Sequence, residues 1–117
     1  MDYIKAQELS KLANSQINFA GQYKEAREKS GIAKSELDIL LAANLLDIRK
    51  KKSNVGYEMA LLMLMESNEV AKDLYKVKIE EEARYKGLEK MIDSLQSKIS
   101  LSQSVMKYID KGEKFGG

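Results

Sequence analysis

Apolar residues in the last third of the chain recur at alternating steps of three and four positions. This spacing is the narrow a/d stripe of a heptad repeat, which packs knobs into holes against another helix. A stripe that is kept over more than three heptads requires a partner helix, and we expect a second copy of the chain to supply it. This heptad seam consists of Tyr85, Leu88, Ile92, Leu95, Ile99, Ser102, Met106 and Ile109.

The first thirty residues carry a broader apolar stripe with charged side chains mostly outside it, which predicts an amphipathic helix over about 2–29. Gly31 can adopt the left-handed conformation that ends a helix. Ser35 and Asp38 resemble a capping box, in which Asp replaces the usual Glu. We therefore expect a turn near residues 30–35. The stripe includes Leu9, Leu12, Ala13, Gln16, Phe19, Ala20, Tyr23 and Ala26.

Two strongly apolar segments follow this expected turn. The first, residues 37–48, is about half the ~20 residues needed to cross a bilayer, so it predicts a buried helix over 35–52 and no membrane span. The second, residues 59–65, predicts a short helix over 57–66. Its methionines can fill gaps in a core or form an adaptable groove for a partner.

The longest helix is expected over residues 68–111, because Asn68 or the serine before it can cap a helix there. Gly87 interrupts this helix at a cost of about 1 kcal/mol relative to alanine. A tail, residues 112–117, follows, and we expect Phe115 within it to dock on a neighbouring helix or subunit.

Composition supports the same fold class. The chain has 117 residues, no proline and seven glycines, so almost nothing in it forbids long helices. We predict a single all-α domain over 1–117, built of helical hairpins with a long C-terminal helix, that forms a homo-oligomer through the heptad seam.

Catalytic chemistry has little support in the sequence. The chain contains no histidine and no cysteine, so the usual general base, thiol nucleophile and transition-metal ligands are missing. The three consecutive glutamates at 80–82 are better explained as a solvated charged face than as a metal site, since a bundle site usually needs Glu-x-x-His. No phosphate-binding glycine loop occurs. We expect no enzymatic activity, no cofactor and no metal, and a cytoplasmic location because cysteine and a secretory signal are both lacking.

The strongest candidate for a functional surface is the basic run, which consists of Arg49, Lys50, Lys51 and Lys52. The formal net charge of the chain is only +2, so four adjacent cations are its main local source of positive potential. Tyr57 follows closely and is a candidate platform for stacking a base. The alternative is that the run only caps the negative end of a very apolar helix.

From residue 67 onward the sequence resembles the UvsY family, the small recombination mediators of tailed phages. The resemblance rests on a Ser-Asn-Glu turn, a long helix with the heptad seam, and a basic end with Phe and Gly. Its residues include Ser67, Asn68, Glu69, Asp73, Tyr75, Tyr85, Leu88, Ile92, Leu95, Ile99, Val105, Met106, Lys107, Tyr108, Ile109, Lys114, Phe115 and Gly116.

The resemblance implies binding of single-stranded DNA through cations near the end of the second helix, which correspond to the basic run. It also implies rings formed through the C-terminal helices, displacement of single-strand-binding protein and loading of a RecA-type recombinase in the host cytoplasm. The alternative is a helical protein-interaction module without nucleic-acid binding, such as a phage scaffold, chaperone or host-defence inhibitor. The sequence does not distinguish DNA from RNA.

Overall fold

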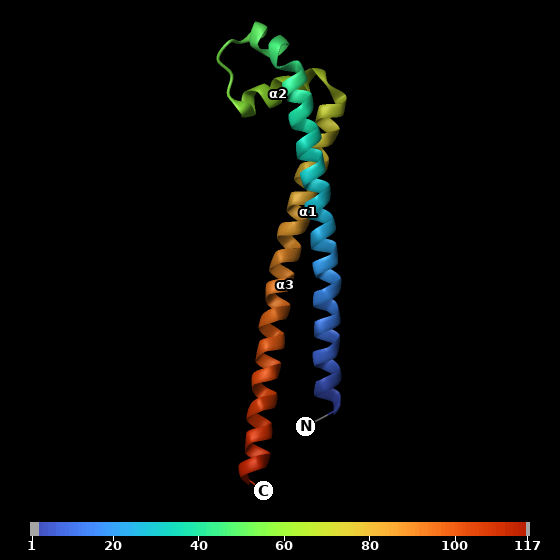
Figure 1. The fold of residues 1–117 in the computed structure, drawn as a ribbon, viewed down its shortest axis with the longest axis vertical. Helices are drawn as coiled ribbons and strands as arrows, with labels where there is room; N and C mark the ends of the chain where they lie inside the picture. The colour runs from blue at the N-terminus through green and yellow to red at the C-terminus, as the bar shows by residue number, and fades with distance from the viewer. Residues whose placement is uncertain (1–2, 117) are drawn as a thin grey trace. The chain divides into compact units, whose positions relative to one another are not determined.

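The computed structural model describes the backbone of residues 3–116 and the side chains of residues 6–109. Every regular element within the described backbone is a helix: α1 spans Tyr3–Lys51, α2 spans Tyr57–Ser67 and α3 spans Glu69–Gly116 (Figure 1). The predictions of an all-α fold and of a long C-terminal helix are confirmed. α2 matches the short helix expected from the second apolar segment.

The predicted turn at residues 30–35 is wrong, because α1 continues through it as one helix. None of the described glycines has a positive φ, and a Cβ at Gly31 would meet nothing within 4 Å. The physical reason is that the inward face of α1 continues across this segment without interruption. Ala26, Ala33 and Leu37 are all buried there, and burial of this face outweighs the roughly 1 kcal/mol cost of a glycine.

The predicted end of the last helix near Gly112 is also wrong, since α3 continues to Gly116. Helices can run past a glycine that keeps helical torsions, and no proline follows to stop this one. The side chain of Phe115 lies outside the described residues, so its docking stays a prediction.

Both long helices carry a continuous inward face with three- and four-residue spacing. In α3 this face begins well before the heptad seam, at Ala71, Leu74, Lys78 and Glu81, and none of its side chains is exposed. In α1 the inward face consists of Leu9, Leu12, Gln16, Phe19, Tyr23, Ala26, Ser30, Ala33, Leu37, Leu40, Asn44 and Ile48, again with none exposed. These two faces explain why α1 and α3 form long helices without a strong local signal at every turn.

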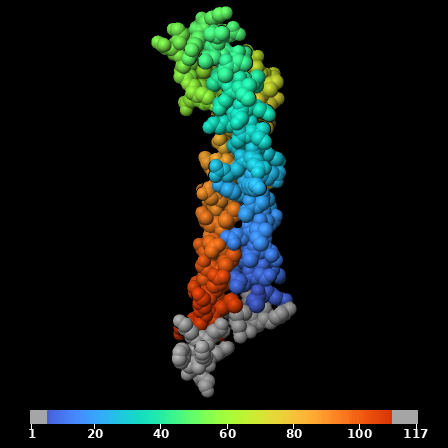
Figure 2. Space-filling model, in the orientation of Figure 1, coloured from blue at the N-terminus to red at the C-terminus, as the bar shows by residue number. Residues whose placement is uncertain are grey.

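The chain forms two compact units. Unit 1 comprises Met1–Lys24 and Tyr85–Gly117, and unit 2 comprises Glu25–Arg84. Unit 1 therefore pairs the start of α1 with the end of α3, and these segments touch as the blue and orange surfaces of Figure 2. Unit 2 contains the rest of α1, all of α2 and the start of α3.

In unit 1 the heptad seam packs against α1 of the same chain. The rings of Tyr23 and Tyr85 meet edge to face with centroids 5.9 Å apart, and Gln16 Nε2 donates a hydrogen bond of 2.7 Å to Gln96 Oε1. Tyr23 of α1 meets Tyr85 of α3, whereas the earlier residue Gln16 meets the later residue Gln96, so the two segments are antiparallel. The partner helix that the heptad pattern requires is thus present within the chain, and self-association through the seam stays a prediction.

The core of unit 2 forms where α2 packs between the end of α1 and the start of α3. α2 contributes Ala60, Leu61 and Leu64 to this core. The other members are Leu37, Leu41 and Ile48 of α1 and Ala71 of α3. The backbone N–H of Ala71 donates to Asn68 Oδ1 at 3.1 Å, which confirms the predicted cap at the start of α3.

Unit 2 also contains a chain of ion pairs between α1 and α3. Glu25 lies 2.8 Å from Lys29 and 4.0 Å from Arg84, and Arg84 lies 3.3 Å from Glu81. The hydrogen bond and positive charge of Lys29, followed by the charge of Arg84, lower the pKa of Glu25. We call these four residues the ion-pair network.

Candidate nucleic-acid interface

The basic run lies at the C-terminal end of α1. Arg49, Lys50 and Lys51 form the last turn of the helix. The next residue is Lys52, whose backbone N–H still donates to Ile48 O at 3.0 Å. All four side chains are exposed. The negative end of the helix dipole stabilises cations at this position, so the capping role and a binding role are physically compatible.

The charges of the basic run are largely unneutralised within unit 2. Lys50 Nζ lies 4.0 Å from Asp47 Oδ1, and both side chains are highly exposed, so this pair contributes little stability. Arg49, Lys51 and Lys52 form no ion pair with any of the side chains that the structure describes. Lys51 also borders a small hollow together with Met63 and Ser67, near the end of α2. The run therefore offers three cations to an external anion.

The structure does not bring the Tyr57 hydroxyl to the basic run. This hydroxyl donates a hydrogen bond of 2.8 Å to Asp38 Oδ1. Asp38 precedes Arg49 by eleven residues, which corresponds to about 16 Å along a helix axis. The Tyr57 side chain is half exposed, so stacking of a base on its ring stays a prediction, but the ring and the cations do not form one compact site.

Replacing Tyr57 with phenylalanine is expected to reduce the loss of folding stability at alkaline pH. The hydrogen bond to Asp38, followed by burial, raises the pKa of Tyr57 above its usual value. A raised pKa in the folded state means that this stabilisation is complete below about pH 10 and is lost as the pH rises through the folded pKa. Urea unfolding at pH 8 and pH 11 measures this loss, and Tyr57→Phe should show a smaller difference between the two. An equal difference in both proteins would contradict the assignment.

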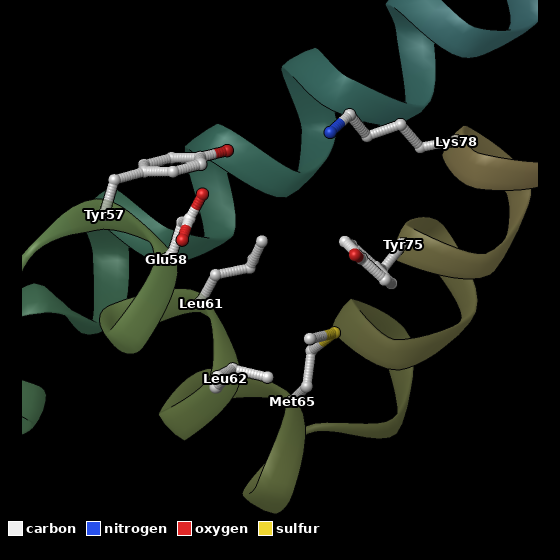
Figure 3. Close-up of a pocket in the computed structure, with 7 residues that line it drawn as sticks. All are labelled: Tyr57, Glu58, Leu61, Leu62, Met65, Tyr75 and Lys78. Carbon is white, nitrogen blue, oxygen red and sulfur yellow. The ribbon is translucent and has the colours of Figure 1, made fainter. Parts of the chain in front are cut away.

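A cavity of about 380 Å³ opens beside Tyr57, between α2 and α3 (Figure 3). Lys78 Nζ lies 5.8 Å above the ring centroid of Tyr75 and 3.7 Å from Glu82. The cavity thus combines apolar side chains with the carboxylate of Glu58 and with one ammonium group that is already paired. Its lining consists of Tyr57, Glu58, Leu61, Leu62, Met65, Tyr75 and Lys78.

Sequence reasoning missed this cavity. The sequence feature that indicates it is Lys78. The three- and four-residue spacing places this lysine on the inward face of α3, where a charged residue is unusual. Of the second apolar segment, Leu61 and Leu64 are core residues, Met63 and Met65 pack against the core, and Leu62 remains exposed.

The glutamates at 80–82 each pair with a cation on their own helix. Glu80 lies 4.0 Å from Lys76, Glu82 lies 3.7 Å from Lys78, and Glu81 belongs to the ion-pair network. Across the described side chains, no group of three or more acidic residues is placed to hold a metal ion.

No helix in the part of the chain that the structure describes combines the length and the apolar character needed to span a bilayer.

Comparison of the chain with protein-family models, with curated proteins and with solved structures found no match.

Proposed function

We propose that this protein is a non-enzymatic accessory protein that binds single-stranded DNA through the basic run. The observation that carries the proposal is the exposed end of α1, where three of four consecutive cations have no ion pair among the described side chains. Such a cluster attracts phosphates without reading the base sequence, because the energy comes from charge neutralisation and counterion release.

The resemblance to phage recombination mediators extends this proposal to partners. In that role the protein would act in the host cytoplasm, displace single-strand-binding protein and favour loading of a RecA-type recombinase. Each basic run alone supplies few phosphate contacts, so binding by one copy is weak. Assembly of several copies on one strand raises the apparent affinity through multivalency.

Replacing Lys50, Lys51 and Lys52 with alanine is expected to weaken binding to all single strands alike and to flatten the dependence of affinity on salt. Fewer neutralised phosphates release fewer counterions, so the slope of log affinity against log salt falls by about one for each lost contact. Fluorescence anisotropy with labelled oligo(dT), a mixed-sequence strand and oligo(rU) across a salt series measures both quantities and compares DNA with RNA.

The matched control removes three exposed lysines elsewhere, Lys24, Lys34 and Lys86. It changes the net charge by the same amount, so it should leave affinity and slope close to those of the unaltered protein. Equal losses in both triple variants would assign binding to overall charge. Unchanged binding in the basic-run variant would leave only the helix-capping role for these cations.

A second candidate function is a helical protein-interaction module. The observation that favours it is a row of apolar side chains on α1, Ile32, Ile39 and Leu46, that are more than half exposed. A protein of this kind would show negligible binding to oligo(dT) at physiological salt, so the same salt series separates the two functions.

A further inference from the structure

Ile32, Ile39 and Leu46 form a second apolar line on α1, which we call the outer face. Their side chains are 58%, 68% and 78% exposed. They are spaced seven residues apart, and seven residues make almost two helical turns, so the three side chains lie in one line. The small exposed residues Ala42 and Ala43 lie between the last two, so another helix can approach this face closely.

The outer face points away from the core of unit 2. Ile39 follows the fully buried Leu37 by two residues, which places it about 200° further around the helix. α2 and α3 cover the side of α1 that carries Leu37, Leu41 and Ile48. The heptad seam is a different surface, because it belongs to unit 1 and packs against the start of α1.

The outer face contains two pairs of complementary positions on either side of Ile39. Ile32 and Leu46 lie seven residues before and after it, and Glu28 and Lys50 lie eleven residues before and after it. Glu28 is exposed and forms no ion pair with the side chains that the structure describes. When two such faces meet antiparallel with Ile39 opposite Ile39, Ile32 meets Leu46 and Glu28 meets Lys50, while Glu36 meets the small Ala42.

We infer that the outer face binds the same face of a second copy of this chain, antiparallel, with Ile39 on the twofold axis. A twofold interface uses one patch on both partners and requires such self-complementarity. Parallel pairing would place Glu28 opposite Glu28 and Lys50 opposite Lys50, and like charges in direct opposition are unfavourable. The contact covers residues 28–50, about 33 Å of helix, and holds two basic runs at its opposite ends.

Single cysteines test the arrangement directly, because the chain has none of its own. A disulfide requires Cα atoms about 4.4–6.8 Å apart. Under mild oxidation Ile39→Cys should therefore form a covalent dimer. Ile32→Cys or Leu46→Cys alone should not, since each lies about 21 Å from its own copy in this arrangement. A mixture of those two variants should form the mixed dimer, and Ile17→Cys, equally exposed on α1, is the control.

Charge exchange provides an independent measurement by sedimentation of the protein without nucleic acid. Glu28→Lys and Lys50→Glu should each raise the dimer dissociation constant at least about tenfold, and the double variant should restore it. Covalent dimers of each of the three single variants Ile32→Cys, Ile39→Cys and Leu46→Cys would show parallel pairing and overturn the inference. A monomer at all concentrations, or no rescue in the double variant, would also overturn it. Because no nucleic acid is present, such a failure would leave the DNA-binding proposal untouched.

Discussion

Leu37→Ala is expected to lower the free energy of unfolding by about 3 kcal/mol. Leu37 is fully buried, and it is the largest side chain among the described residues to be so. It lies where the end of α1 meets α2, so truncation leaves a cavity that three helices must close. Urea unfolding followed by circular dichroism, at a protein concentration low enough to exclude association, measures the change.

Leu101→Ala is the matched control for this variant. Leu101 is 66% exposed on a long helix of the same protein, and leucine and alanine have similar helix propensities. The control should change the free energy of unfolding by less than about 0.5 kcal/mol. Equal effects of the two substitutions would mean that the packing around Leu37 does not hold unit 2 together.

Ile99→Asp should have a comparable or larger effect on unit 1. Ile99 is 8% exposed in the heptad seam, and a carboxylate there would have to be buried without a partner, at a cost of several kcal/mol. We expect loss of helical circular dichroism at 222 nm and a lower urea midpoint. Leu101→Asp, two residues further along α3, places the same charge on the exposed side and should leave both nearly unchanged.

The concentration dependence of this loss tests the partner of the seam. Packing against α1 of the same chain predicts a loss of helix that is the same at all protein concentrations. Packing against a sister helix predicts that higher concentration partly restores the helix, because association is a mass-action equilibrium. Full retention of helix in Ile99→Asp would contradict packing of the seam against either partner, α1 of the same chain or a sister helix.

The sequence was sufficient to predict elements whose signals are local. The Asn68 cap, the short apolar helix and the strict spacing from Tyr85 onward all correspond to features of the structure. The predicted break at Gly31 is wrong because it rests on a glycine and a nearby capping pattern. The apolar spacing of Ala26, Ala33 and Leu37 continues across this glycine, and the helix follows that spacing. The spacing is present in the sequence, but its small residues indicate a buried helix face less clearly than large apolar residues do.

Tertiary contacts account for what the sequence could not supply. A heptad pattern specifies that a helix needs a partner but not which helix provides it, so the pairing of Tyr85 with Tyr23 was not predictable. The hydrogen bond between Tyr57 and Asp38 joins residues on different helices, and no local pattern marks it. It nevertheless separates the tyrosine hydroxyl from the basic run and so changes the geometry of the candidate site.

The ion-pair network has a consequence for how α1 and α3 are aligned in unit 2. An apolar repeat by itself allows one helix to slide past another by a whole heptad, about 10 Å. Such a slip would carry Arg84 away from Glu25, which is the one pair of the network that joins the two helices, whereas the pair of Glu81 and Arg84 lies within α3 and would move as a unit. The pair of Glu25 and Arg84 beside the inward faces therefore favours one alignment among those that the repeat permits.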